Sequence, residues 1–544
     1  MAAQEHVGDG VRRGASTRPS AQKSPAGQQT DGRPNIITII LDDMRADDLD
    51  AMPAVQSLLV AQGSRFQNCI VAAPLCAPAR ASILRGQYAH NHGILRGSGV
   101  KGGFRLFRSS GQDTSTIATW LQAAGYRTAL FGKYLNGYLD DEDPSNSDGD
   151  AYIPPGWDEW VGMTETGYFR FVVNDGGELK QFRTGKKHQY DAKRLGRSWY
   201  NKKGRARYSV ADKKHPYSTD VMAARALDFV KRTARGNQPF FMYVAPFAVH
   251  GPAEPAVRHA TASNGAMVPR TAAFNEADVS DKPTWVQQTP LLSESQAAEL
   301  DSRHAARRGT LLAVDEFVQS LIDRLAQERI LDNTYIVLSS DHGFLLGEHR
   351  LAAKGVPYEQ AINVPLVMRG PTVPAGAVID QLVSQVDLAP TFAGWAEAAT
   401  PSFVDGRSLT PLLQEARHET QWREHALVEH YRRSRDDEVK SPGFCALRGD
   451  RFVYVEYQPP LRPDADVDDQ QAEVQPAPEP SSTVQRELYD LTMDPLQLLN
   501  LIRTAEPALV ESFSKKLASM RTCRGASCRE TEVLAVDPTW VPTA

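Results

Sequence analysis

The chain has 544 residues, of which 41% are apolar and 23% are charged, and its formal net charge is −5 at pH 7. This composition is typical of a soluble globular protein, and the small net charge without a basic block argues against nucleic-acid binding. The length exceeds what one ordinary compact core fills, so we expect one large α/β domain with a smaller attached unit.

Residues 1–33 hold Gly, Ser, Gln, Pro and charged residues without an apolar core segment, which predicts a disordered tail. The pair Arg12-Arg13 is similar to a twin-arginine signal, but no hydrophobic region follows it. The apolar run 36–41 is far shorter than the roughly 20 residues that span a bilayer. We therefore expect no membrane partner and favour a cytoplasmic location, with secretion or periplasmic export as the alternative if a signal has been removed.

From Pro34 onward, short apolar runs alternate with amphipathic patterns. The predicted strands are 35–41, 127–132, 239–246, 334–340 and 364–368. Their apolar runs are continuous, so both faces of each strand should be buried. A helix is predicted over Thr310–Arg324, where apolar residues recur at helical spacing. This alternation predicts a mostly parallel sheet sandwiched by helices.

Charged or imidazole side chains follow four of these strands, at the point where each strand ends. They are Asp42 and Asp43, Lys133, His250, and Asp341 with His342. In an open α/β sheet, ligands bind outside the carboxyl ends of the strands, so these groups should meet at one edge. Asp42 and Asp43 are neighbours, and two neighbours that reach one point imply a sharp turn around a cation. Carboxylate oxygens are what a hard divalent ion prefers.

The C-terminal part of the chain predicts a small α+β unit. It contains strands over 451–457 and 486–490 and a closing helix over 505–520. We place the large α/β domain at 34–398, the C-terminal subdomain at 399–535 with a mobile, solvated loop over 459–483, and a tail at 536–544. Residues 253–300, rich in Ala, Ser, Thr and Pro, form either an excursion over the site or a surface loop.

Five cysteines, an odd number, do not make a disulfide framework in a chain of this length. Cys523 and Cys528 could close a short loop in an oxidising compartment. Cys69 and Cys445 are expected to be small buried residues. Cys76 differs from the others because of the residues that follow it.

Residues 76–86 read Cys-Ala-Pro-Ala-Arg-Ala-Ser-Ile-Leu-Arg-Gly, which predicts a helix that begins near Cys76. A helix N-terminus stabilises negative charge on a neighbouring nucleophile. With Pro78 and Arg80, this stretch resembles the signature of the type I sulfatases, members of the alkaline phosphatase superfamily. The resemblance implies an alkaline-phosphatase-like fold and oxidation of Cys76 to formylglycine (3-oxoalanine) by a formylglycine-generating enzyme that reads Pro78 and Arg80. The alternative is a structural cysteine at a buried helix start.

The same resemblance implies a metal site. Its ligands would be Asp42, Asp43, the modified residue 76, Asp341 and His342. Many relatives have asparagine where this chain has His342, and imidazole is a softer ligand than an amide oxygen. We expect calcium, with manganese or magnesium as alternatives.

Residues that bind the sulfate group are also implied by the family pattern. Lys133 follows Gly132 as the family's sulfate-binding lysine does, and Lys354 resembles a second one. The family's histidine two positions after that first lysine is replaced here by Leu135, so we expect Asn136 to supply the hydrogen bond. His250, in a segment similar to the family's Pro-His-x-Pro, is the expected general acid. Arg80 is expected to contact the metal-bound nucleophile or its ligands.

The expected activity is hydrolysis of sulfate monoesters. Within the family, residues 132–136 and 488–495 resemble most the branch that contains N-acetylglucosamine-6-sulfatases. The resemblance therefore implies a sulfated sugar of the N-acetylglucosamine-6-sulfate type, or a small aryl sulfate, as substrate. Two alternatives stay open: a phosphonate monoester hydrolase or phosphodiesterase of the same superfamily, and a non-catalytic pseudo-sulfatase that binds sulfated glycans.

Overall fold

The computed structural model describes residues 32–99, 102–139, 151–183, 216–414, 421–431, 441–457 and 484–536. Most of the predicted N-terminal tail lies outside this part of the chain. The predicted loop over 459–483 lies outside it entirely, as does the predicted C-terminal tail apart from Val536.

A large mixed sheet forms the centre of the molecule, and the part of the chain described contributes eleven strands to it. Ten of them follow the order β10-β2-β9-β8-β1-β7-β3-β4-β5-β6, and β11 pairs with β2. The strands are β1 Asn35–Leu41, β2 Ser64–Ile70, β3 Arg127–Gly132, β4 Glu159–Glu165, β5 Arg170–Asp175, β6 Glu178–Arg183, β7 Phe240–Ala245, β8 Thr334–Ser340, β9 Asn363–Arg369, β10 Ala377–Ile379 and β11 Val383–Ser384.

The five strands predicted from continuous apolar runs are confirmed, and they lie side by side in the middle of the sheet as β9-β8-β1-β7-β3. β1 pairs in parallel with β7 and β8, and β3 pairs in parallel with β7 and β4. Strand β9 is antiparallel to β8. The parallel strands therefore bring their carboxyl ends to one edge, as the sequence predicts.

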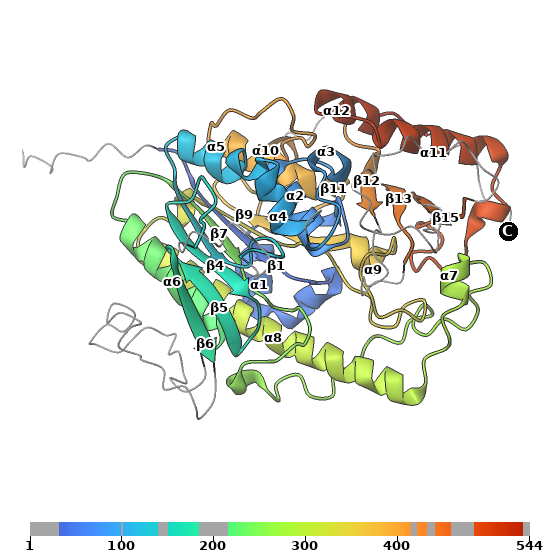
Figure 1. Ribbon diagram of the computed structural model, residues 1–544, viewed down its shortest axis with the longest axis horizontal. Helices are drawn as coiled ribbons and strands as arrows, with labels where there is room; N and C mark the ends of the chain where they lie inside the picture. The colour runs from blue at the N-terminus through green and yellow to red at the C-terminus, as the bar shows by residue number, and fades with distance from the viewer. Residues whose placement is uncertain are drawn as a thin grey trace, which may run out of the picture.

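Helices cover both faces of this sheet (Figure 1). The helices are α1 Pro53–Val55, α2 Cys76–Arg85, α3 Ala89–His92, α4 Gly103–Ser109, α5 Ile117–Ala123, α6 Ser218–Thr233, α7 Thr284–Gln287, α8 Glu294–Gln327, α9 Glu359–Ile362, α10 Leu388–Trp395, α11 Pro507–Met520 and α12 Ala526–Glu532. Along β1, Ile36 and Ile40 pack into the core beneath α2, α5 and α10. Ile37 and Ile39 pack into the opposite core, with α6 and α8. Burial of both faces explains why β1 is apolar at nearly every position.

Helix α8 corrects one prediction. It begins at Glu294, not near Thr310, so residues 294–300 are helical and belong to neither an excursion nor a surface loop. Ser293 caps the helix, and its hydroxyl oxygen accepts from the backbone N–H of Gln296. The first turns are rich in Ala, Glu and Arg, which favour a helix by propensity without the apolar periodicity on which our prediction relied.

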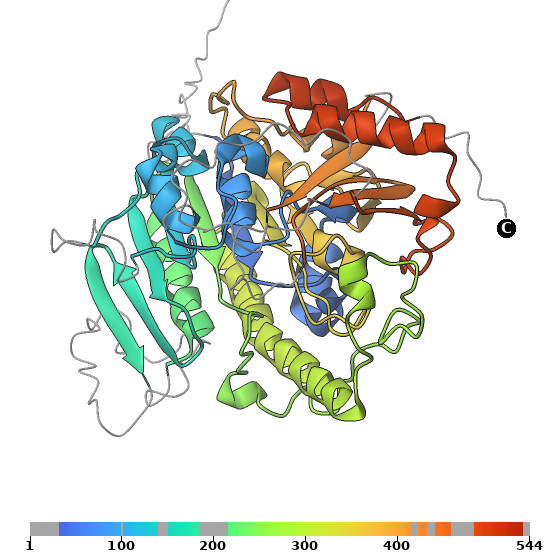
Figure 2. The same ribbon diagram turned by 45° about the vertical axis from the view of Figure 1, so that its right-hand side comes forward.

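A second, smaller sheet lies toward the C-terminus, on the other side of the molecule from β4–β6 (Figure 2). Its antiparallel strands, in order, are β12 His425–His430, β13 Phe444–Gly449, β14 Phe452–Tyr457 and β15 Arg486–Asp490. Leu447 and Tyr454 pack in one apolar cluster with Phe513 and Leu517 of α11. The smaller α+β unit is thus present. Cys69 and Cys445 are buried, and Cys523 and Cys528 form a disulfide.

Among the helices of the described ranges, none combines the length and apolar character that a membrane crossing needs.

Candidate active site

The site begins where β1 ends, at Asp42 and Asp43. Asp43 has a left-handed backbone conformation, with φ of 68°. The backbone N–H of Asp42 donates to Ala248 O (2.9 Å), and that of Asp43 donates to Asp341 Oδ1 (3.1 Å). Left-handed backbone is unusual for a residue with a side chain. It produces the sharp turn that the sequence predicted, and both carboxylates reach the same buried space.

Cys76 is the first residue of α2 and is only 3% exposed. Its Sγ lies 3.2 Å from Lys354 Nζ, 3.2 Å from His342 Nε2 and 3.6 Å from Asp42 Oδ1. The N-terminus of α2 adds a favourable field for negative charge at this position. Cys76 is therefore the point at which the cationic groups and the carboxylates of the site meet.

Arg80 lies one turn further along α2 and is fully buried. Its Nε donates to Asp341 Oδ2 (2.9 Å) and its Nη1 donates to Lys133 O (3.0 Å). Its Nη2 is 3.8 Å from Asp42 Oδ1. Arg80 thus joins the ends of β1, β3 and β8, and it contacts the candidate ligands rather than Cys76 itself.

Two buried lysines flank Cys76 from different parts of the chain. Lys133 Nζ donates to Asp42 Oδ2 (2.5 Å), and Lys354 Nζ donates to Asp43 Oδ1 (2.9 Å). Gly132 allows Lys133 to enter the site, because its φ is +124° and a Cβ there would lie 1.9 Å from Ala245 O. The loop with Lys354 is anchored near Cys76 by the backbone bond from Gly355 N to Pro74 O (2.9 Å).

Two histidines complete this arrangement. His342 is fully buried, and its Nδ1 lies 3.0 Å from Gly343 O, which leaves Nε2 to face Cys76 and Asp43 Oδ1 (3.4 Å). His250 Nδ1 lies 2.7 Å from Gly251 O, and its Nε2 is 3.3 Å from Lys354 Nζ. In each ring a carbonyl holds the Nδ1 proton, so Nε2 is the atom that acts in the site.

The charges of the site shift one another's pKa values. Burial acts to raise the pKa of Asp42, but Lys133 and the other cationic groups hold it well below its usual value. Lys354 does the same for Asp43. Burial, with the neighbouring Asp42, raises the pKa of Asp341 to about 6. For His342, burial favours the neutral ring, but Asp341 raises the pKa to about 9.

These side chains fit a divalent cation. Two overlapping sets of ligand atoms, from Asp42, Asp43, Cys76 and His250 and from Asp42, Cys76, Asp341 and His342, each lie within 4.8 Å of one another. The three buried carboxylates face Arg80, Lys133 and Lys354, and even so the pKa of Asp341 stays raised. A divalent cation would favour their ionised forms, including that of Asp341. Oxygen ligands dominate the set, and His342 Nε2 adds a nitrogen.

Two further residues hold the site and were not predicted from the sequence. Arg307, in the middle of α8, donates to Asp43 O (2.6 Å). Gln385 donates to the backbone oxygens of Ser340 and Asp341 (both 2.7 Å). No local pattern marks either residue, since each acts on a segment distant in sequence.

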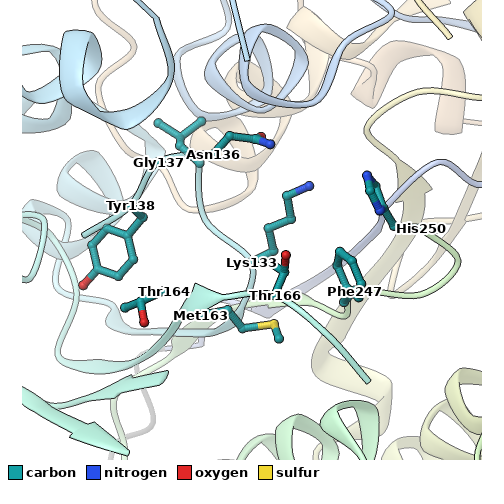
Figure 3. Close-up of a pocket in the computed structure, with 10 residues that line it drawn as sticks. Lys133, Asn136, Gly137, Tyr138, Met163, Thr164, Thr166, Phe247 and His250 are labelled. Atoms are coloured by element: carbon teal, nitrogen blue, oxygen red, sulfur yellow. The ribbon is translucent and has the colours of Figure 1, made fainter. Parts of the chain in front are cut away.

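Asn136 lies apart from the carboxylates. It lines a pocket that also contains Lys133, His250 and Phe247 (Figure 3). The structure therefore brings every predicted site residue to one region, with Asn136 at its margin.

The chain matches two family models. The sulfatase model covers residues 34–398, and the model of the C-terminal region of N-sulphoglucosamine sulphohydrolase covers residues 347–466. An extracellular sulfatase Sulf-1 homolog of Caenorhabditis elegans is 32% identical over 73% of this chain, which spans 53% of that protein. Human N-acetylglucosamine-6-sulfatase is 29% identical over 91% of this chain and 86% of its own length. A SULF-1 homolog of Drosophila melanogaster is 32% identical over 70% of this chain, which spans 31% of that protein.

Solved structures share the fold. A protein in complex with its substrate D-glucosamine-2-N,6-O-disulfate superimposes with a TM-score of 0.69 at 21% identity, over 92% of this chain and 98% of that one. The phosphonate monoester hydrolase of Agrobacterium radiobacter has a TM-score of 0.62 at 21% identity, over 90% of this chain and 95% of that one. With a family model that matches about two thirds of its length and the alkaline-phosphatase-like fold, the chain belongs to the sulfatase family.

Proposed function

We propose that this protein hydrolyses sulfate monoesters, with a formylglycine made from Cys76 as nucleophile and a divalent cation held by His342 and the aspartates that follow β1 and β8. The observation that carries the proposal is the position of Cys76 Sγ, 3.2 Å from both Lys354 Nζ and His342 Nε2. One side chain thereby contacts a candidate sulfate-binding cation and a candidate metal ligand. The formylglycine-generating enzyme would be a partner during maturation.

The two lysines suit a sulfate ester, whose negative charge is spread over its oxygens. Lys133 and Lys354 are buried and held by Asp42 and Asp43, so their ammonium groups need little rearrangement when substrate binds. The divalent cation, when bound, supplies further positive charge that polarises the sulfate and favours an ionised nucleophile. Arg80 keeps Asp341 and the end of β3 in place through its buried hydrogen bonds.

Modification of Cys76 gives the site a route that a thiol lacks. The hydrated aldehyde supplies two hydroxyls on one carbon: attack by one on sulfur forms a sulfate ester at residue 76 and releases the alcohol, and proton loss from the other expels sulfate and restores the aldehyde. The water that hydrates the aldehyde is the one consumed in each cycle.

His250 is the proposed general acid. Burial lowers the pKa of His250, but the carboxylates of Asp43 and Asp42 outweigh it and raise that pKa, so they favour the charged ring. Its Nδ1 faces the oxygen of Gly251, so the proton on Nε2 is the one aimed into the site. Protonation of the leaving oxygen by Nε2 lets the alcohol depart as a neutral molecule.

The proposed substrate is a sulfated sugar of the N-acetylglucosamine-6-sulfate type, or a small aryl sulfate. The likeness to N-acetylglucosamine-6-sulfatase over 91% of the chain supports the sugar. Calcium is the proposed ion because the ligand set is mostly oxygen, and the nitrogen of His342 keeps manganese or magnesium as alternatives.

Two measurements test the proposal. The mass of the peptide that contains Cys76, from protein made with an active formylglycine-generating enzyme, should be that of formylglycine. The same protein should hydrolyse 4-nitrophenyl sulfate faster than a phenyl phosphonate monoester. The reverse order of rates would favour the phosphonate hydrolase reading, which the phosphonate hydrolase fold neighbour keeps open. A thiol at residue 76 together with no turnover would favour the non-catalytic pseudo-sulfatase.

A further inference from the structure

A pocket opens beside the lysine and histidine of the site, between the turn that follows Lys133 and strand β4. It is lined by Lys133, Leu135, Asn136, Gly137, Tyr138, Met163, Thr164, Thr166, Phe247 and His250. Figure 3 shows the Lys133 and His250 side chains at one side of this pocket, with the end of the Asn136 side chain turned toward them and Thr164 and Met163 at the other. The pocket is therefore continuous with the site and distinct from the carboxylate cluster.

The position of the pocket fits the part of the substrate that leaves. Lys133 Nζ contacts Asp42 on the inner side, and His250 Nε2 lies 3.3 Å from Lys354 Nζ. His250 is the proposed general acid, so it must reach the ester oxygen of the substrate. A sulfate held by Lys133 and Lys354 would therefore have its ester oxygen near His250. The group attached to the ester oxygen then extends away from Cys76, which is 3% exposed, and into the pocket that His250 also lines.

The walls combine apolar surface with neutral polar groups. Met163 and the ring of Phe247 offer apolar surface, whereas Asn136 and Thr166 offer an amide and a hydroxyl. The Oδ1 atom of Asn136 is buried and has no hydrogen-bond partner within the described ranges. A buried acceptor without a partner is costly, so the pocket favours a ligand that can donate an O–H or N–H to this oxygen. A sugar ring has apolar C–H faces and hydroxyl edges, and a plain aryl ring has no donor to offer.

Tyr138 does not compete for this ligand through its hydroxyl. That group donates to Tyr152 O (2.5 Å) and accepts from Asn174 Nδ2 (2.8 Å), so it is already paired. Tyr138 therefore contributes only contact surface to the pocket, and Asn136 is the residue that can hydrogen-bond to the polar edge of a ligand.

The charge of the lining residues and the volume of the pocket further restrict the class of ligand. Among the lining residues that the structure describes, Lys133 and His250 are the basic ones, and none is acidic. Both serve the sulfate that is cleaved. The volume of about 130 Å³ is below the roughly 300 Å³ at which pockets for drug-sized ligands begin, so it suits one ring.

We propose that this pocket is the leaving-group subsite for a single neutral sugar ring, and that Asn136 Oδ1 accepts a hydrogen bond from a hydroxyl or amide N–H of that ring. The proposal rests on the proposed function and narrows its substrate to a sugar without a second anionic group. A substrate that carries another sulfate on the same ring would have to bury that charge without a cation in the described lining.

The test uses the full chain, carrying formylglycine and loaded with the divalent ion. The ratio of kcat/KM for N-acetylglucosamine 6-sulfate to kcat/KM for 4-nitrophenyl sulfate should fall by about tenfold in Asn136→Leu, because that variant loses a hydrogen bond to the sugar alone. Asn264→Leu, an exposed asparagine outside the pocket, should keep the wild-type ratio. An unchanged ratio in a folded Asn136→Leu protein would overturn the assignment.

Two further measurements on the wild-type protein do not depend on a variant. N-acetylglucosamine should inhibit hydrolysis of 4-nitrophenyl sulfate competitively, and glucosamine 2-N,6-O-disulfate should have a lower kcat/KM than the monosulfated sugar. Absence of inhibition, or preference for the disulfate, would overturn the subsite while the proposed function stands. If neither sulfate ester is hydrolysed, the proposed function fails. The subsite is then decided by whether N-acetylglucosamine perturbs the NMR spectrum of the wild type but not of Asn136→Leu.

Discussion

Arg80 Nε lies 2.9 Å from Asp341 Oδ2, and neither side chain has any exposed surface. The same guanidinium donates to the backbone oxygen of Lys133 (3.0 Å). One residue of α2 therefore fixes the ends of β3 and β8 relative to the helix that carries Cys76. A buried charge that loses its partner is costly, so this pair should matter for folding as well as for catalysis.

Replacing Arg80 with Met should lower the free energy of unfolding by about 3–5 kcal/mol, because Asp341 would be left buried beside Asp42 without its guanidinium partner. Urea unfolding of the two proteins measures the difference. Arg232→Met is a matched control, since Arg232 is 46% exposed and pairs with Glu159 at the surface. Arg232→Met should lower the free energy of unfolding by about 1 kcal/mol or less. Equal losses for the two variants would contradict the role given to Arg80.

Cys76→Ala should abolish hydrolysis of 4-nitrophenyl sulfate and leave the fold intact, because the change removes the proposed nucleophile and only one heavy atom from the core. Activity and thermal unfolding, measured on the same preparation, check both parts. Cys69→Ala removes the same atom from a buried position in β2 that takes no part in the contacts described for the site, and it should keep the wild-type kcat. Substantial turnover by Cys76→Ala would end the nucleophile assignment.

The ion pair of His90 should make the free energy of unfolding depend on pH. Burial opposes its charge, but the ion pair of Nδ1 with Glu429 Oε2 (2.9 Å) raises its pKa from 6.5 to about 9. A raised folded-state pKa means that the stabilisation is complete below about pH 6.5 and is lost as the pH rises to about 9. The charged His90 ring should contribute about 3 kcal/mol in full to the free energy of unfolding.

The measurement is urea unfolding of wild type and His90→Gln across this pH range. The stability difference between them should be largest below about pH 6.5 and should vanish above about pH 9. Comparison of the two proteins cancels the titration of other groups. A difference that stays constant with pH would show that the imidazolium contributes nothing.

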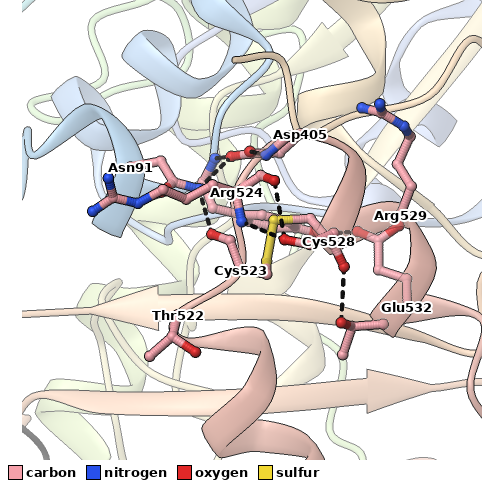
Figure 4. The surroundings of a disulfide bond; sticks show 12 residues. Asn91, Asp405, Thr522, Cys523, Arg524, Cys528, Arg529 and Glu532 are labelled. Carbon is pink, nitrogen blue, oxygen red and sulfur yellow. Dashed lines mark hydrogen bonds between the residues drawn. A yellow bond between two sulfur atoms is a disulfide. The ribbon is translucent and has the colours of Figure 1, made fainter. Parts of the chain in front are cut away.

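The disulfide between Cys523 and Cys528 holds a short loop against α3 (Figure 4). Cys523 O accepts from His90 Nε2 and from Asn91 Nδ2, both at 2.9 Å. Closing a loop of this length stabilises a fold by about 2 kcal/mol in the chain-entropy account. The double variant with alanine at both positions should lose that amount in urea unfolding. A reducing agent should cause the same loss in wild type and none in the variant; insensitivity of the wild type would argue against the bond.

Glu276 should influence catalysis from outside the site. Its Oε2 lies 2.6 Å from Nδ1 of the buried His349, in the loop that leads to Lys354. Glu276→Gln weakens this contact, and a small displacement of Lys354 should lower kcat for 4-nitrophenyl sulfate by roughly ten- to hundredfold. Glu276→Asp keeps the carboxylate and should retain a larger part of the wild-type kcat than Glu276→Gln does. Glu316→Gln is the control, because Glu316 of α8 forms a more exposed pair with His259. Equal kcat values for Glu276→Gln and this control would refute the positioning role.

The five strands in the middle of the large sheet were predictable because each contains a continuous apolar run, a property that local sequence displays. Strands β2, β4–β6, β10 and β11 of the same sheet were not predicted. β2 is only partly buried, with Arg65, Gln67 and Asn68 more accessible than its apolar residues. β4–β6 form an antiparallel extension whose residues have mixed polarity. Their order in the sheet is decided by partners far away in the chain, which no short window contains.

The sequence by itself determined the chemical groups of the site: the cysteine at a helix start and the acidic, basic and imidazole residues at four strand ends. These follow from local patterns, because a buried parallel strand and its polar end are adjacent in the chain. Only the tertiary structure decided how these groups are held, through Arg307, Gln385 and the Glu276–His349 contact, and where the pocket beside Asn136 lies. Those contacts join residues about 40 to 260 positions apart, and their geometry depends on the packing of the whole fold.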